Sequence, residues 1–280
     1  RDRIMAALTV LAFLLALLPL VSLVVQTLGS GLERLDAAYF SNSMRNVVGA
    51  GGGAVHAIYG TLIVTGLTTL ISVPIGLLCA IYLVEYGQGR RLARSITFFV
   101  DVMTGIPSIV AGLFAYALFG VLFGPGTVNG LAGAVALSVL MIPTIVRSAE
   151  EYLRLVPHEL REASYALGVP KWRTILKIVL PTAMAGIVTG VILAIARVIG
   201  ETAPLLVTMG YTDSLNVNPT AHAMTTLPVF VYYQFMQPGE PAAAYLTRAW
   251  TGALTLVVIV MLLNAIGRLV ARRFAPKSHA

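Results

Sequence analysis

Two charged residues inside an apolar run, Arg197 and Glu201, are the part of this sequence that most clearly suggests chemistry. A charge at the centre of a membrane span costs about 2.5–3.5 kcal/mol on insertion scales, so such side chains generally face a cavity or a partner. Helical i,i+4 spacing places both on one face, about 6 Å apart along the axis, with Thr202 directly following. The pair predicts a pathway for a polar solute; an ion pair that only fixes a helix bundle is the alternative.

The predicted helix face of Arg197 also carries small residues. They are Gly186, Gly190, Ala194 and Pro204. Small side chains either allow helices to pack closely or leave room for a solute. The sequence leaves both interpretations open.

A second polar group lies in another apolar run. Asp101, Thr104 and Ser108 share one predicted helix face, and Pro107 interrupts the backbone hydrogen bonds between them. Polar side chains at a broken helix suit the lining of a cavity. Ordinary hydrogen bonding between helices, together with a proline kink, is the alternative.

The sequence offers little for catalysis or for a cofactor. Ser108 with His222 is a weak candidate for a hydrolase, because no third group is evident and we expect His222 in an outer loop. The four histidines lack metal-ligand spacing, and the one cysteine excludes a disulfide framework. No G-x-x-x-x-G-K-[ST] sequence occurs, so another chain must bind any ATP and Mg²⁺. We therefore expect no catalytic residue, metal site or cofactor in this chain.

The composition is typical of an all-α polytopic membrane protein. Of the 280 residues, 58% are hydrophobic and 11% are charged, too few charges to cover a soluble domain. Several apolar runs reach the length of about 20 residues that spans a bilayer. The net charge of +7 indicates membrane topology and not nucleic-acid binding.

We expect six membrane spans, which put both termini on one side. The outer segments would then hold only Arg34, Arg45 and Arg248, and the membrane Arg197, whereas the other fifteen Lys and Arg residues fall on the inner side. This asymmetry predicts cytoplasmic termini. The expected spans are residues 4–28, 57–84, 96–123, 128–146, 182–209 and 250–270.

Two outer segments, 29–56 and 211–247, are long. The first contains a glycine cluster at 49–53 that we interpret as a flexible linker. The second carries an apolar stretch from Thr226 that is too short to span, so it dips into the interface or caps the bundle.

Residues 147–181 collect charges of both signs between two spans. Ser148 and Glu151 have the spacing of a capping box, which predicts a helix start, and Pro157 ends that piece. A second helix follows at about 158–167. The segment is therefore expected to form a water-facing docking surface.

The second helix of this segment has a defined apolar face and a defined end. Gly168 suits the left-handed position after a helix, and Pro170 begins a third helical run. The apolar face would hold Leu160, Ala163, Ser164 and Leu167.

Residues 147–181 resemble the EAA loop of ABC-importer permeases, whose pattern is E-A-A, three residues, Gly, nine residues and I-x-L-P. Every spacing is met, with a serine in place of the second alanine, at Glu162, Ala163, Ser164, Gly168, Ile178, Leu180 and Pro181. In that family the loop forms coupling helices that sit in a groove of the ATPase subunit. The resemblance thus implies a coupling role for Glu159, Glu162, Ala163, Ser164, Leu167, Gly168 and Pro170.

The resemblance extends over nearly the whole chain. Residues 57–86, 105–114 and 190–206 are similar to the A-type permeases of bacterial phosphate-specific transport (Pst) systems. This implies a type I importer fold in a single permease domain, 1–280, with a peripheral first helix at 1–28 and a MetI-like core at 57–270.

The same resemblance implies an assembly. The expected partners are a homologous C-type permease in a heterodimer, two ATPase subunits, an extracytoplasmic phosphate-binding protein, and the lipid of the bacterial cell membrane. Each permease would form half of a phosphate pathway that opens by alternating access.

In this setting the charged pair acquires a specific interpretation. The planar fork of Arg197 matches phosphate geometry. Glu201 accepts hydrogen bonds, which protonated phosphate donates and sulfate cannot. A permease for another oxyanion, such as sulfate or molybdate, is one alternative, and a secondary transporter or channel is the other.

Overall fold

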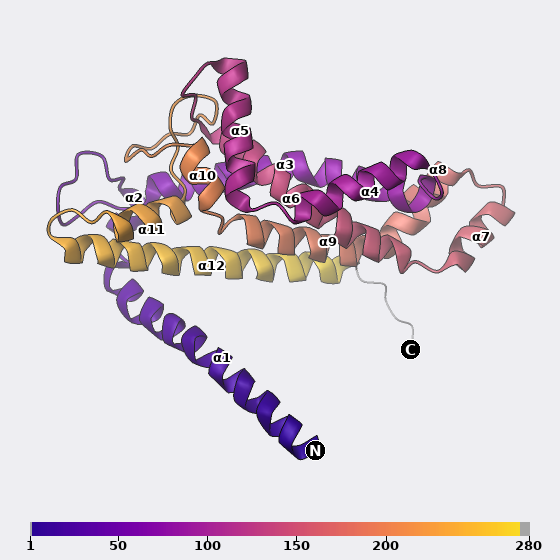
Figure 1. Cartoon of the computed structure of the whole chain (residues 1–280), viewed down its shortest axis with the longest axis horizontal. Helices are drawn as coiled ribbons and strands as arrows, with labels where there is room; N and C mark the ends of the chain where they lie inside the picture. Colours follow the sequence, from indigo (N-terminus) through magenta and orange to yellow (C-terminus); the bar gives the residue numbers. More distant parts are fainter. Residues whose placement is uncertain (1, 275–280) are drawn as a thin grey trace.

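The computed structural model describes residues 2–274, and in this range it consists of helices and connecting loops without strands. Four long helices run side by side and form a bundle (Figure 1), in which α3 packs on α6, α6 on α9, and α9 on α12. They are α3 (Val55–Ile81), α6 (Gly130–Arg154), α9 (Leu180–Val198) and α12 (Ala242–Phe274). Arg1, Lys277 and His279, which entered the charge and metal arguments, lie outside the described residues.

The expected class, an all-α polytopic membrane protein, is confirmed. Within residues 2–274, five segments are long and apolar enough to cross a bilayer, and one bent pair of helices would make a sixth crossing. The five are Asp2–Arg34, Val55–Tyr86, Gly130–Arg154, Lys171–Val198 and Ala242–Arg273.

The third expected span, 96–123, is wrong as a single helix. It consists of α4 (Arg91–Thr104) and α5 (Ser108–Phe123), which are bent by 109° relative to each other. Pro107 has an extended backbone and disfavours a helical residue before it, so the chain turns here. Asp101 and Thr104 therefore do not share a continuous face with Ser108.

The fifth expected span, 182–209, is also interrupted. α9 ends at Val198, and a separate short helix, α10 (Ala203–Thr208), begins with a proline in its first turn. Arg197 thus lies in the last turn of α9, and Glu201 lies beyond the end of that helix. The expectation that both residues occupy one face of a regular helix is wrong.

The first helix, α1 (Asp2–Gly31), touches the bundle only near its C-terminal end. Thr27 and Gly31 are its buried residues, and a Cβ on Gly31 would meet Leu254 of α12 at 2.9 Å. The rest of α1 leaves the bundle at an angle, as Figure 1 shows.

At the end of the bundle opposite α7 (His158–Ala166), the short helix α11 (Leu227–Met236) packs on α12 and α3 with Leu227 and Phe230 fully buried. Of the two roles expected for this stretch, the structure shows the cap on the bundle. α11 also contributes Gln234, which accepts a hydrogen bond from a fully buried charged residue of α12.

Arg248 is that buried charge, although the sequence placed it in an outer segment. It lies within α12 at 0% exposure and donates to Gln234 Oε1 at 2.9 Å and to the carbonyl oxygens of Gly49 and Gly51 at 2.7 and 3.1 Å. Arg34 Nη2 donates a hydrogen bond to the carbonyl oxygen of Gly52 at 2.9 Å. The glycine cluster is therefore clamped by two arginines, and the expectation of a flexible linker is wrong.

One prediction concerns the close packing of α3. A Cβ on Gly60 would collide with the backbone oxygen of Thr225, whereas Gly66, on the same helix, has nothing within 4 Å. We expect Gly60→Ala to destabilise the protein by about 1–3 kcal/mol because the backbone must move. Gly66→Ala should be neutral or stabilising by up to about 1 kcal/mol, through helix propensity. Thermal unfolding of the two variants in detergent measures the difference, and equal melting temperatures would contradict it.

Candidate functional site

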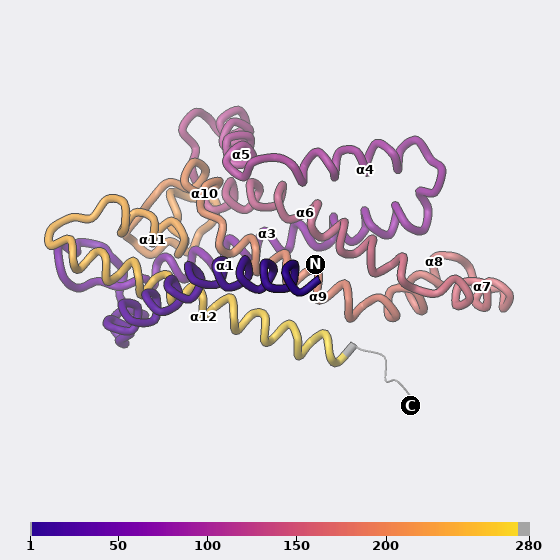
Figure 2. The backbone as a smooth tube through the Cα atoms, turned by 60° about the horizontal axis from the view of Figure 1, so that its bottom comes forward, coloured from indigo at the N-terminus to yellow at the C-terminus, as the bar shows by residue number. Residues whose placement is uncertain are grey.

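The two breaks in the helices lie next to each other. A Cβ on Gly112 of α5 would be 2.6 Å from the Cα of Pro204 of α10, so the starts of these helices are in direct contact. Figure 2 shows α5 and α10 together at one end of α4. Because Ser108 begins α5 and Thr202 directly precedes α10, the structure brings these two predicted residues into one region.

The charged pair stands at the same break, but not as an ion pair. Arg197 is exposed, and Glu201 and Thr202 are half-buried. Among residues 2–274, no salt bridge or side-chain hydrogen bond joins Arg197 to Glu201. The alternative of a pair that fixes the bundle thus finds no support within this chain. An exposed arginine within a segment long and apolar enough to cross a membrane needs water, a solute or another chain to solvate it.

The small residues of α9 serve helix packing. A Cβ on Gly190 would meet the Ser148 side chain of α6 at 2.6 Å, Gly186 lies against the ring of Tyr152, and Ala194 is buried. Of the two interpretations offered by the sequence, the structure shows close packing of α9 on α6.

Asp101 belongs to a separate network. It lies toward the end of the bundle that the expected topology places on the cytoplasmic side, which we call the inner end. It is ion-paired with Arg147 of α6, which also donates to Glu150 Oε2 at 3.0 Å. Glu150 in turn accepts from Arg154 at 2.6 Å. The network ties α4 to α6, and the i,i+3 and i,i+4 spacing on α6 was the sequence signal for it.

Thr104 and His222 have local roles. Thr104 donates to the carbonyl oxygen of Val100 in its own helix at 2.8 Å, and His222 is exposed in a loop with a positive φ of 58°. Within residues 2–274, no group of three or more His, Cys, Asp or Glu could hold a metal ion.

The segment 147–181 begins within α6, continues through three short elements at the inner end of the bundle, and ends at the start of α9. α6 continues to Arg154, so the helix start expected from Ser148 and Glu151 is wrong. The elements that follow are α7 (His158–Ala166), α8 (Lys171–Thr174) and the π-helical turn η3 (Ile175–Val179), which leads directly into α9. α7 and α8 project from the end of the bundle in Figure 1. Gly168 adopts the left-handed φ of 73° that the sequence predicts.

Most of the residues for which the resemblance implies a coupling role are exposed. Those that are exposed are Glu159, Glu162, Ala163, Leu167, Gly168 and Pro170. Leu167 is 83% exposed and Leu160 41%. From the predicted apolar face only Ser164 packs inward, where its hydroxyl lies 2.8 Å from that of Thr174. α7 therefore presents leucines and carboxylates side by side, which suits docking to another chain.

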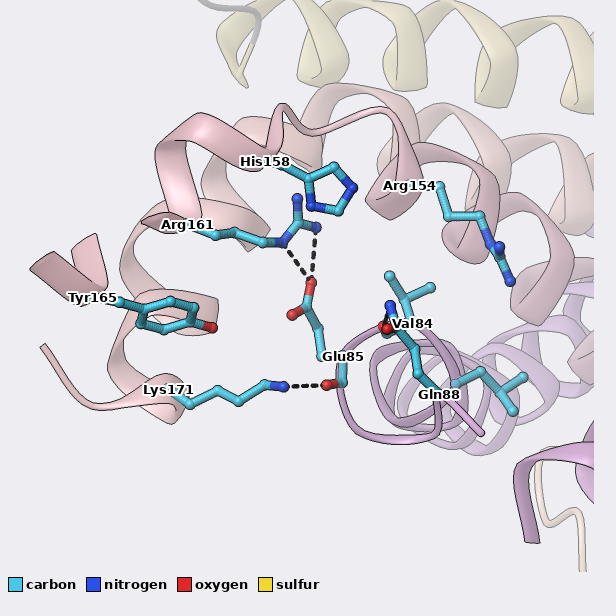
Figure 3. A pocket seen from close by; sticks show the side chains of 9 residues that line it. Val84, Glu85, Gln88, Arg154, His158, Arg161, Tyr165 and Lys171 are labelled. Carbon is cyan, nitrogen blue, oxygen red and sulfur yellow. Dashed lines mark hydrogen bonds and ion pairs between the residues drawn. The ribbon is translucent and has the colours of Figure 1, made fainter. Parts of the chain in front are cut away.

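Behind α7 lies a hollow of about 410 Å³ between α7, α8 and the inner end of α3. Figure 3 shows Glu85 and Arg161 pointing toward each other across it, with Lys171 beside them. Glu85 lies in the π-helical turn η2 (Tyr82–Tyr86) that ends α3. The sequence argument missed Glu85, although it is the only carboxylate between residues 37 and 100.

Tyr165 forms another wall of this hollow. Burial raises the pKa of its hydroxyl, and the negative charge of Glu85 raises it further. The group is therefore a neutral hydrogen-bond donor at physiological pH.

Comparison with known proteins gives one consistent result. The family model "Binding-protein-dependent transport system inner membrane component" matches residues 72–279. The phosphate transport system permease protein PstA 1 of Mycobacterium tuberculosis (strain ATCC 25618 / H37Rv) is 47% identical over 268 residues, which cover 94% of this chain and 85% of the relative. The PstA permease of Yersinia pestis is 38% identical over 279 residues, covering 100% of this chain and 92% of the relative.

Solved structures show the same fold. An inward-facing structure of the MetNI methionine ABC transporter aligns with a TM-score of 0.65 at 24% identity, covering 79% of this chain and 96% of that one. An amino acid ABC transporter aligns with a TM-score of 0.59 at 19% identity, covering 78% and 92%. The helical bundle, the matched family model and the extensive sequence identity lead to one assignment: the chain belongs to the binding-protein-dependent transport system inner membrane components, and within them to the PstA family of phosphate transport system permeases.

Proposed function

We propose that this chain forms half of the translocation pathway of an ATP-driven inorganic phosphate importer. Its relatives from Mycobacterium tuberculosis and Yersinia pestis carry the name of phosphate transport permeases and match over most of their length. The other half of the pathway is supplied by a homologous C-type permease. An extracytoplasmic binding protein delivers phosphate, and two ATPase subunits bind ATP and Mg²⁺.

The observation that carries this proposal is the exposed Arg197 at the break between α9 and α10. Exposing a cation to lipid has a high free-energy cost. We therefore place Arg197 in a water-filled pathway shared with a second permease. Its guanidinium fork attracts the oxyanion during passage. Glu201, Thr202 and Ser108, which lie at the two neighbouring breaks, complete the polar lining.

Phosphate differs from sulfate in carrying protons at neutral pH. The carboxylate of Glu201 accepts a hydrogen bond from protonated phosphate, which fully ionised sulfate cannot donate. We assign most of the selectivity to the binding protein, since a pathway must release its cargo.

The segment 147–181 receives the ATPase on the cytoplasmic side. Fifteen Lys and Arg residues lie on that side in the expected topology, which places both termini in the cytoplasm. The exposed Glu159, Glu162 and Leu167 of the α7 region contact the ATPase groove. ATP binding closes the ATPase pair and moves α7, and hydrolysis resets it.

The movement has a short route to the pathway. η3 joins α8 to α9 without a loop, and α9 carries Arg197 about 24 Å from Pro181 along the helix axis. The same motion that displaces α7 thus tilts the helix that ends at the charged break, which opens the pathway alternately to each side.

Copurification and transport test the proposal together. Purified in mild detergent from its own membranes, the chain is expected to retain an ATPase and a second permease. In proteoliposomes with the binding protein, the complex should accumulate ³²P-phosphate only with ATP. Accumulation of sulfate instead would support the other-oxyanion alternative, and full activity of the isolated chain without ATP would support a secondary transporter or channel.

A further inference from the structure

Glu85 and Arg161 form a buried ion pair that joins two segments far apart in the sequence. Arg161 Nε and Nη2 donate to Glu85 Oε1 at 3.1 and 2.8 Å. Arg161 is 8% exposed and Glu85 7%. Each charge depends on the other, because neither is solvated by bulk water.

The same arginine also closes the end of α6. Its Nη1 donates to the carbonyl oxygen of Val156 at 2.7 Å, and its Nη2 donates to that of Leu153 at 3.0 Å. Leu153 lies in the last turn of α6 and Val156 follows the helix. Carbonyl oxygens at the end of a helix lack partners within the helix. Arg161, which lies on α7, therefore binds the end of α3 and the end of α6 at once.

A second cation, from α8, also contacts the end of α3. Lys171, the first residue of α8, donates to the backbone oxygen of Glu85, and its ammonium lies 4.9 Å from the centre of the Tyr86 ring. Figure 3 shows that Arg161 of α7 and Lys171 of α8 each contact Glu85. The turn that ends α3 is thus held by its carboxylate and by its backbone.

Without these contacts, α7 has little to fix it to the rest of the chain. Its main packing contacts are with α8 and η3, its own neighbours in sequence, and most of its surface is exposed. α3, by contrast, packs extensively on α6 in the centre of the bundle. The ion pair is the direct connection from α7 to α3.

We propose that Glu85, Arg161 and Lys171 form a latch that makes the inner end of α3 move as one body with α7 and α8. A displacement of α7 by the ATPase then reaches the bundle through α3 as well as through α9. These are positioning residues, and the inference rests on the coupling role proposed for α7. Breaking the latch lets α7 move while α3 stays behind, so ATP is hydrolysed with less transport.

The first test measures phosphate transported per ATP hydrolysed, with the complete complex in proteoliposomes. Glu85→Gln is expected to lower this ratio about fivefold or more, in the range of typical coupling energies, while ATPase activity and assembly remain. Arg161→Gln and the double variant should lower it at least as much, because both remove the ion pair and also the hydrogen bonds from Arg161 to the end of α6. The double variant leaves no buried charge unpaired, so it keeps the test valid if a single variant fails to fold. Asp2→Asn and Arg90→Gln, which remove exposed charges outside both the latch and the segment 147–181, are the matched controls.

The second test measures the motion itself. Spin labels at Gln88→Cys and Tyr165→Cys, in a Cys79→Ser background, report the distance between the end of α3 and α7. With the latch intact, we expect one distance, unchanged between the nucleotide-free and ATP-bound complex. Glu85→Gln should add a second, state-dependent distance. A distance that changes with ATP in the intact latch, or one unaffected by Glu85→Gln, overturns the proposal.

A parallel variant, Glu162→Arg, separates this inference from the function on which it rests. If Glu162→Arg uncouples transport and Glu85→Gln does not, the latch is wrong and the coupling role of α7 stands. If neither variant changes the ratio, both are wrong.

Discussion

Arg197→Ala is expected to reduce phosphate uptake at least about tenfold while the complex still assembles. A hydrogen bond to a charged group contributes about 1.5–3 kcal/mol, and Arg197 would offer phosphate several such donors at the break between α9 and α10. The variant removes no contact that holds the chain together, because Arg197 is exposed and makes no ion pair with residues 2–274. Initial rates of ³²P-phosphate uptake, with retention of the partner chains on the tagged variant, measure both quantities.

Two further variants make this result specific. Arg197→Lys keeps the charge but loses the planar fork, so we expect uptake between that of the wild type and that of Arg197→Ala. Arg268→Ala removes an exposed arginine at the inner end of α12 and should leave uptake unchanged. Normal uptake by Arg197→Ala, or loss of the partner chains along with uptake, would remove Arg197 from the proposed pathway.

Glu162→Arg is expected to separate ATP hydrolysis from transport. Glu162 is exposed on α7 beside Ala163 and close to the exposed Leu167, so a reversed charge changes the docking surface without disturbing the packed residues behind it. We expect the transport per ATP hydrolysed to fall about fivefold or more, as befits the loss of a coupling interaction. ATPase activity and uptake are measured in the same proteoliposomes.

The control for this variant is a charge reversal outside the segment 147–181. Asp2→Arg alters an exposed carboxylate at the start of α1, and it should keep the normal ratio of transport to hydrolysis. Unimpaired coupling in Glu162→Arg, with the complex intact, would show that α7 does not transmit the ATPase motion through this residue.

The sequence by itself determined the class of the protein and the position of the charged segment that we propose as the docking surface. Backbone groups in lipid must be satisfied within the segment, so a long apolar run has to form a helix whatever its neighbours are. The turn at Gly168 was also predictable from the local sequence. Glycine has no side chain, so it adopts the left-handed φ of 73° after a helix without strain. The charges of 147–181 excluded that segment from lipid, and the structure places α7 at the end of the bundle.

Only the tertiary structure decided which polar residues meet. Periodicity assumed unbroken helices, so it put Arg197 and Glu201 on one face, whereas α9 ends between them. A proline or glycine in an apolar run permits either a kink or a complete turn, and packing of α5 against α10 selected the turn. Glu85 and Arg161 are separated by 76 positions, and no local pattern connects them. Their ion pair exists because α7, which carries Arg161, folds against the turn at the end of α3 that carries Glu85. A buried charge on one element is then neutralised by the element that packs against it.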